Sequence, residues 1–275
     1  MLYEQPTDAA YRRFYLWLHQ IVDRAIERIL DGLHDAALAD DTIVVFTSDH
    51  GDLLGAHGGL QQKWHNAFDE TVRIPFVASG PGIPSGGDGL ISPTSHVDVL
   101  PTLLGLAGID LERAAKVVGE QHVETQPPVG RDLSAAIRSG RDDALECEPV
   151  YFMTEDQISR GLRTANMFTG EPYEAVGEPG NVESVIATLT SGDDDELWKL
   201  NHYYAHAENA DAEDADAEDA TPAEWELHNL SADPEERRNL AGAGVPQLYE
   251  MRGLLDAARE AGRRSPLVTN RTEVG

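Results

Sequence analysis

Residues 42–51 read TIVVFTSDHG, which places an apolar, β-branched run directly before Asp49, His50 and Gly51. A short run of this kind predicts a β-strand that is buried on both faces, as in the parallel sheets of α/β proteins. Open α/β sheets bind ligands in the crevice outside the carboxyl ends of their strands. Asp49 and His50 can both ligate a metal ion, so this strand end is the first candidate for a chemical site.

The segments around this strand predict alternating helices and strands. Between residues 11 and 39, apolar residues recur every three or four positions with charged residues between them, which predicts a long amphipathic helix before the strand. A second strand is expected over residues 74–79 and a helix over residues 96–108. We therefore expect an α/β fold for residues 1–145, with a partial doubly wound sheet and flanking helices.

The pattern changes after about residue 146 to short strand-like runs followed by one helical segment. These runs predict a small antiparallel sheet with a packed helix, and thus a carboxyl-terminal α+β subdomain over residues 146–275. Within it, residues 207–222 are nearly all Ala, Asp and Glu, and we expect them to form a disordered acidic insertion. The strands are expected at residues 150–153, 185–189, 196–200 and 225–228, and the helix at residues 246–261.

The composition is strongly acidic, with 21 Lys and Arg against 49 Asp and Glu among 275 residues and a formal net charge of −28. Such a surface argues against nucleic acid and anionic membranes as partners, and it favours a halophilic source, where salt screens the self-repulsion. Cys147 is the only cysteine, so no intrachain disulfide can form, which favours a cytoplasmic location. No run approaches the roughly 20 apolar residues that span a bilayer.

The longer phrase that begins at Thr47, TSDHGDLLGAHGGLQQKWHNAFDETVRIPFVASGPG, resembles the sulfatase family of the alkaline-phosphatase superfamily. The resemblance implies an alkaline-phosphatase-like fold and metal-dependent hydrolysis of a sulfuric ester of a sugar or an aryl alcohol. A phosphodiesterase or phosphonate monoester hydrolase of the same superfamily is the alternative, because phosphate and sulfate esters share their geometry. Other segments that look like parts of sulfatases are residues 96–104, 225–230 and 233–235.

The resemblance also implies roles for individual residues, with Asp49 and His50 as ligands of a divalent cation and Lys63 as the cation that binds the sulfate group. Their chemistry agrees, since a metal ion and an ammonium group can neutralise the non-bridging oxygens of a sulfate ester. The family favours Ca²⁺ or Mg²⁺, and the imidazole ligand leaves Mn²⁺ open as well. Taken alone, Asp49 before Gly51 is more commonly explained by an Asx turn, whereas within the whole phrase that resembles the family metal ligation is the better explanation.

The other polar residues of this loop allow a second interpretation. His57 could reach the bound sulfate or the leaving group as a catalytic residue, or it could only pack its own loop. His65 is expected to be exposed to solvent. Glu70 and Arg73 flank the entry to the second strand and are expected to form a structural ion pair.

The nucleophile that the family uses is not found before Asp49. Sulfatases carry a Cys or Ser in a C-x-P-x-R phrase, matured to formylglycine, together with a further Asp pair at an earlier strand end. The tripeptide Cys147-Glu148-Pro149 lacks the Arg of that phrase, and Asp8 is better explained as a helix cap.

We therefore expect this chain to be the carboxyl-terminal part of a sulfatase that has little or no activity alone. A sheet without its first strands should expose an edge and an apolar face, and these would bind an amino-terminal half or a second copy of the chain. A non-catalytic remnant that binds a partner chain is the competing interpretation.

Overall fold

The computed structural model describes residues 8–60, 62–63, 66–86, 89–122, 124–125, 128–141, 148–155, 181–191, 194–204, 224–263 and 268–269. The predictions for His65, Cys147 and the acidic insertion at residues 207–222 lie outside the described residues. Within these ranges, no helix combines the length and the apolar character needed to cross a membrane.

The amino-terminal part contains the predicted helix and both predicted strands, with α1 (Asp8–Asp35) followed by β1 (Val44–Thr47) and, further on, β2 (Phe76–Ser79). The two strands pair antiparallel, with Val44 opposite Ser79. The predicted helix at residues 96–108 is found as a 3-10 turn that continues into α4. The other elements of this part are η1 (Ala39–Asp41), α2 (Ala56–Gly59), α3 (Asp69–Val72), η2 (His96–Asp98), α4 (Val99–Leu106), α5 (Leu111–Gln121), α6 (Ser134–Ser139), and β3 (Glu124–Thr125) paired with β8 (Val268–Thr269).

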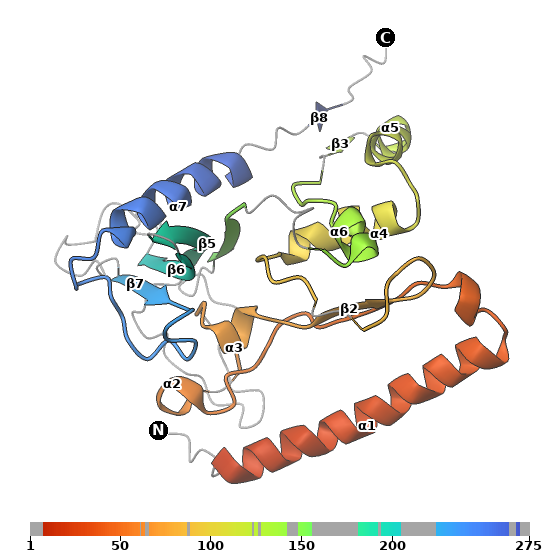
Figure 1. Cartoon of the computed structure of the whole chain (residues 1–275), viewed down its shortest axis with the longest axis horizontal. Helices are drawn as coiled ribbons and strands as arrows, with labels where there is room; N and C mark the ends of the chain where they lie inside the picture. The colour runs from red at the N-terminus through yellow and green to blue at the C-terminus, as the bar shows by residue number, and fades with distance from the viewer. Residues whose placement is uncertain are drawn as a thin grey trace, which may run out of the picture.

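The expectation that the first strand is buried on both faces was wrong. Phe46 on β1 is 46% exposed and its cross-strand neighbour Val77 on β2 is 56% exposed, so the described residues leave the sheet face that carries both uncovered. Helix α1 runs along the edge of the molecule, and no described helix or strand covers its outer side (Figure 1). Helix α1 also carries an exposed apolar stripe, which consists of Phe14, Trp17, Leu18, Ile21, Val22 and Ile29.

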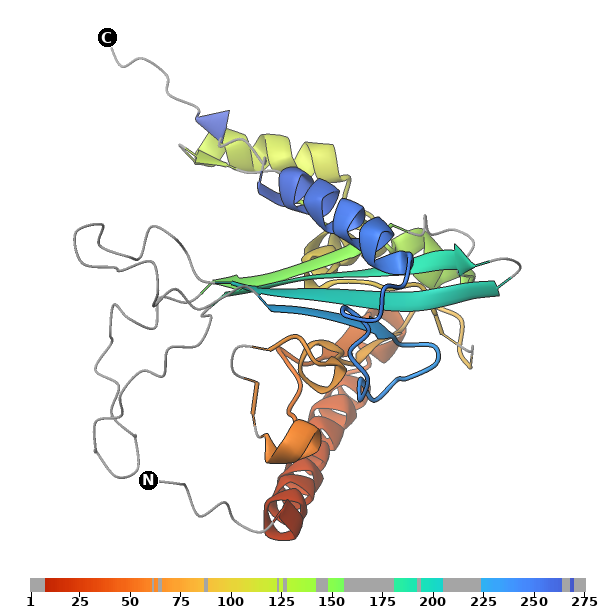
Figure 2. The ribbon, with the colours of Figure 1, turned by 90° about the vertical axis from the view of Figure 1, so that its left-hand side faces the viewer.

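The carboxyl-terminal part confirms the predicted antiparallel sheet and its helix. Its four strands follow one another in chain order, and each pairs antiparallel with the next. Figure 2 shows α7 lying along one face of this sheet. The elements are β4 (Val150–Glu155), β5 (Asn181–Ser191), β6 (Asp194–Tyr204), β7 (Glu224–Asn229) and α7 (Gln247–Arg263).

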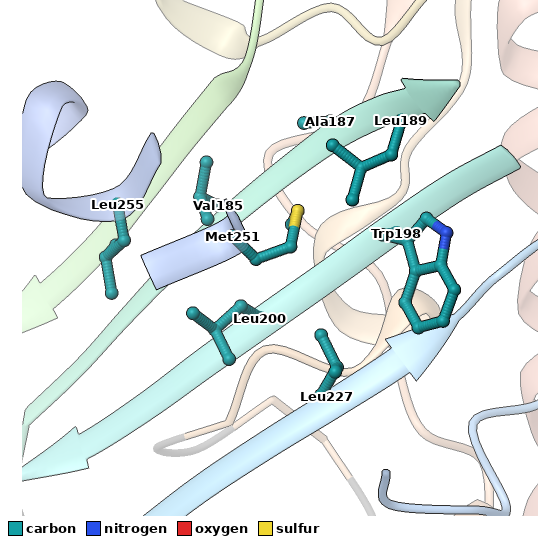
Figure 3. Packing of buried hydrophobic residues seen from close by; sticks show 8 residues of the cluster. All are labelled: Val185, Ala187, Leu189, Trp198, Leu200, Leu227, Met251 and Leu255. Atoms are coloured by element: carbon teal, nitrogen blue, oxygen red, sulfur yellow. The ribbon is translucent and has the colours of Figure 1, made fainter. Parts of the chain in front are cut away.

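The two faces of this sheet differ in chemistry because side chains alternate along each strand. Toward α7, the strands and the helix bury a continuous apolar cluster (Figure 3), formed by Val185, Ala187, Leu189, Trp198, Leu200, Leu227, Met251 and Leu255. The intervening positions on β6 and β7 hold buried polar residues, among them Lys199, Asn201 and His228. Lys199 contacts Ala67 and Asp69 of the amino-terminal part, so this polar face is the one that meets the candidate site loop.

We expect Leu255→Ala to lower the free energy of unfolding by about 2–5 kcal/mol, because it leaves a cavity in the core between α7 and the sheet. Leu255 is fully buried, whereas Tyr249 on the same helix is 76% exposed. Tyr249→Ala is therefore the control and should change stability by less than about 0.5 kcal/mol. Urea denaturation of both variants measures the difference, and equal effects would contradict the described packing.

Candidate functional site

The loop that follows β1 holds Asp49 and His50 side by side. The Oδ2 atom of Asp49 lies 3.3 Å from Nε2 of His50, and Nδ1 of His50 lies 2.7 Å from the carbonyl oxygen of Gly51. A carbonyl oxygen can only accept, so Nδ1 carries the hydrogen and the lone pair of the neutral ring is on Nε2. The backbone thus selects the tautomer whose free nitrogen lies next to the Asp49 carboxylate.

The distance between the Asp49 and His50 side chains is that expected of two ligands bound to one divalent cation. Two ligand atoms at right angles around a cation, with bonds of about 2.1–2.4 Å, lie about 3.0–3.4 Å apart, and the observed separation of 3.3 Å is within that range. The Asp49 side chain is 83% exposed, so an ion can reach it from solvent. Fixing a His ligand through its second nitrogen is also the usual arrangement in metal sites.

Lys63 belongs to the same place. Desolvation raises the pKa of Asp49, but the charge of a protonated His50, backbone hydrogen bonds and the charge of Lys63 outweigh it and hold that pKa below its usual value. The neutral, metal-ligating form of His50 contributes no such charge. One of those hydrogen bonds comes from the backbone N–H of His50, 3.0 Å from Oδ1. The structure therefore brings Asp49 and His50 into contact, and Lys63 is linked to them only through its charge.

His57 is placed by packing. Its ring stacks on Phe68 with 3.6 Å between centroids, and its Nε2 lies 3.0 Å from Oε2 of Glu70. The expected ion pair between Glu70 and Arg73 was wrong, because Arg73 follows the end of α3 and its guanidinium instead reaches Asp69, at 3.4 Å. No contact within the described ranges joins His57 to Asp49 or Lys63, so the geometry favours the packing interpretation of His57.

A second group could hold a metal ion by distance alone, since ligand atoms of His57, Glu70 and Glu236 lie within 4.8 Å of one another. Glu236 is already neutralised, because Nζ of Lys199 lies 2.5 Å from its Oε1. A buried ammonium at that distance would repel a divalent cation strongly. We therefore assign this cluster to the support of the loop.

The Asp49–His50 loop is held from two sides. The backbone N–H of Gly51 donates to the carbonyl oxygen of Thr71, 2.8 Å away, and a Cβ atom at Gly51 would lie only 1.9 Å from the carbonyl oxygen of Glu70. The Tyr11 hydroxyl on α1 donates to Asp52 over 3.0 Å, and burial together with this hydrogen bond raises the pKa of Tyr11 to about 12. The loop is thus fixed between α1 and α3.

Sequence reasoning gave no role to Asp52, Glu236 or Lys199. The available signal was the rarity of lysine, since Lys199 is one of three lysines in a chain that otherwise uses arginine. Its position within an apolar strand pattern was a second signal, because a lysine there must be buried and therefore paired.

Comparison with known proteins connects this geometry to a family. The family model described as Sulfatase matches residues 3–109. Choline-sulfatase of Rhizobium meliloti (strain 1021) is 43% identical over 101 residues, which cover 37% of this chain and 19% of that protein.

Two solved structures are similar to most of the chain. One is a protein in complex with its substrate D-glucosamine-2-N,6-O-disulfate, with a TM-score of 0.59 and 22% identity over 89% of this chain and 40% of the other. The phosphonate monoester hydrolase of Agrobacterium radiobacter gives a TM-score of 0.57 with 20% identity, over 90% of this chain and 40% of the other.

The chain has the α/β fold of alkaline-phosphatase-like hydrolases. Over residues 3–109 its sequence matches the sulfatase family of that superfamily. Its matched regions span less than half of each of these three proteins.

We expect Gly51→Ala to abolish the stabilisation of the protein by Ca²⁺, because the added methyl group would displace the loop from α3 and separate Asp49 from His50. Such overpacking should also cost about 1–3 kcal/mol of stability. The control is Gly253→Ala on α7, where a Cβ atom meets nothing within 4 Å. Thermal unfolding with and without Ca²⁺ measures both, and a full Ca²⁺ response in Gly51→Ala would contradict the described loop.

Proposed function

We propose that this chain supplies part of the active centre of a metal-dependent sulfuric ester hydrolase. Asp49 and His50 hold a divalent cation, and Lys63 binds the sulfate group of the substrate. The observation that carries the proposal is the 3.3 Å separation between Oδ2 of Asp49 and Nε2 of His50.

Each of these residues has a defined task in this proposal. A bound cation neutralises one non-bridging oxygen of the ester. The ammonium of Lys63 offers three donors and a compact positive charge for another oxygen. An aspartate is ionised at neutral pH, and the Gly51 carbonyl keeps His50 in the ligating tautomer. Ca²⁺ or Mg²⁺ is the cation that the family favours, and Mn²⁺ fits the same pair.

The proposed substrate is a sulfate ester of a sugar or an aryl alcohol. It is supported by the structural neighbour whose substrate is D-glucosamine-2-N,6-O-disulfate. A phosphonate monoester is the second candidate, supported by the likeness to the phosphonate monoester hydrolase. Both are tetrahedral oxyanions, and the Asp49–His50 pair and Lys63 would serve either.

We propose further that the attacking nucleophile, a formylglycine in this family, comes from a polypeptide that covers the exposed apolar stripe of α1 and pairs with the free edge of β1. The stripe and Phe46 of β1 form exposed apolar surface that soluble proteins usually bury. A strand added in parallel to β1 would end beside Asp49, since the carboxyl ends of parallel strands lie at one edge of a sheet. The added polypeptide would thus deliver its side chains to the cation.

We expect Asp49→Ala to remove the stabilisation by Ca²⁺ or Mg²⁺, because it deletes one of the two ligands. Ligand binding to the folded state raises the unfolding free energy, so the melting temperature reports it. Asp23→Ala on the exposed side of α1 removes the same charge at a distant position and should keep the response. An unchanged cation response in Asp49→Ala would refute the metal assignment.

The chain alone should hydrolyse no aryl sulfate in high salt with Ca²⁺ or Mg²⁺, whereas co-expression with a sulfatase-family segment that carries the C-x-P-x-R phrase should give turnover. Ile21→Glu with Ile29→Glu should abolish that gain, because the charges disrupt the apolar stripe. Lys116→Glu on α5 is the control for added charge. Turnover by the chain alone, or a stripe that is buried in a dimer of this chain, would contradict the proposal.

A further inference from the structure

Lys199 is a fully buried cation in the middle of β6. Its cross-strand neighbour on β7 is His228, and its side chain lies on the sheet face opposite α7. The Nζ atom donates to the carbonyl oxygen of Ala67 over 2.8 Å and lies 2.5 Å from Oε1 of Glu236 and 3.7 Å from Oδ1 of Asp69. Because a lysine is almost never buried without partners, these contacts explain why it can occupy this position.

Glu236 connects the loop after β7 to the same point. It is 4% exposed and has a positive φ of 50°, a backbone conformation that a residue other than glycine adopts only when its surroundings impose it. Its Oε2 atom accepts from the backbone N–H of Asp69 over 2.6 Å. Both members of the ion pair therefore bind the backbone of residues 67–69, where α3 begins.

From α3 the contacts continue to the candidate site. The carbonyl oxygen of Thr71 accepts from the N–H of Gly51, and the Glu70 carboxylate contacts His57. Gly51 in turn presents the carbonyl oxygen that fixes the ring of His50. An unbroken series of hydrogen bonds and short covalent segments thus runs from the carboxyl-terminal sheet to the proposed metal ligands.

We propose that Lys199 and Glu236 are positioning residues, through which the carboxyl-terminal sheet sets the geometry, and so the cation affinity, of Asp49 and His50. The inference rests on the proposed metal-binding function of that pair. Neither residue touches the cation or the substrate. They act through the backbone of residues 67–71 and the hydrogen bond between Gly51 and Thr71.

The opposite face of the same sheet provides a comparison ion pair whose cation is less buried, since the Arg259 side chain is 30% exposed. Nη2 of Arg259 on α7 lies 2.5 Å from Oε2 of Glu183 on β5, and the Glu183 side chain is 1% exposed. This pair joins the helix to the sheet, and no contact within the described ranges links it to residues 67–71. Arg259→Met therefore removes the cation of a buried pair without touching the route to the site.

The test compares hydrogen exchange at the Gly51 amide, followed by NMR, in Lys199→Met and Arg259→Met. We expect Lys199→Met to lose the protection of this amide and Arg259→Met to keep it. Glu236→Gln perturbs the same route with less change of volume and is the variant to use if Lys199→Met does not fold. Retained protection in the Lys199 and Glu236 variants, or equal loss in Arg259→Met, would overturn the proposal.

A double variant separates positioning from stability. Replacing a buried ion pair by apolar residues often restores stability, so Lys199→Met with Glu236→Met should regain the melting temperature while Gly51 stays unprotected. Its Mn²⁺ affinity, measured by electron paramagnetic resonance of the free ion, should be about 10- to 100-fold lower than that of the unaltered chain. Recovery of both protection and affinity would show that the pair acts only on stability.

The two readouts also separate this inference from the function on which it rests. If Asp49→Ala leaves Mn²⁺ affinity unchanged, the metal assignment fails, whereas the exchange at Gly51 still decides whether Lys199 positions the loop.

Discussion

The buried ammonium of Lys199 is the constraint on which the arrangement of this molecule depends. It lies between the carboxyl-terminal sheet and the loop of the candidate site, with Glu236 as its counterion and the carbonyl oxygen of Ala67 as a further partner. Glu236 in turn accepts from the backbone N–H of Asp69. Leaving such a charge unpaired costs about 3–5 kcal/mol, a large share of the stability of an ordinary domain. Moving the site loop away from the carboxyl-terminal sheet would take partners away from the Lys199 ammonium, so the ion pair holds the loop against the sheet.

The two parts differ in how completely they bury their own apolar surface. The carboxyl-terminal sheet and α7 form a continuous core in which several side chains are fully buried. In contrast, α1, β1 and β2 leave large apolar side chains exposed. The candidate site lies where the well-packed part supports the open one. The carboxyl-terminal sheet thus supports the loop of Asp49 and His50 from one side, and the exposed apolar surface of α1 and β1 is left for the polypeptide that we propose completes the site.

The regular elements and the contact between Asp49 and His50 could be predicted because their information is local. The periodic patterns of α1 and α7 and the alternating runs of the carboxyl-terminal sheet survive in the fold. Asp49 and His50 are neighbours in the chain, and Gly51 beside them is required by the close approach of α3. The contact between Lys199 and Glu236 depends on which strands lie together, and periodicity does not contain that information.

Two expectations failed for physical reasons that the sequence does not show. A strand is buried on both faces only when a layer of structure covers each face of its sheet. Among the described residues β1 pairs only with β2, and its Phe46 stays exposed. The expected pairing of Glu70 with Arg73 assumed that proximity in sequence decides partners. Helix α3 ends at Val72, so Arg73 reaches back to Asp69 while Glu70 is drawn to His57.

The central claim, that His50 and Asp49 bind one cation, is tested most directly by electron spin-echo envelope modulation of the protein loaded with Mn²⁺. The account predicts coupling to a single imidazole nitrogen that disappears in His50→Ala and persists in His57→Ala. No nitrogen coupling, or a coupling that is lost in His57→Ala instead, would contradict it and would place the metal at the cluster of His57, Glu70 and Glu236 or outside the imidazole groups altogether.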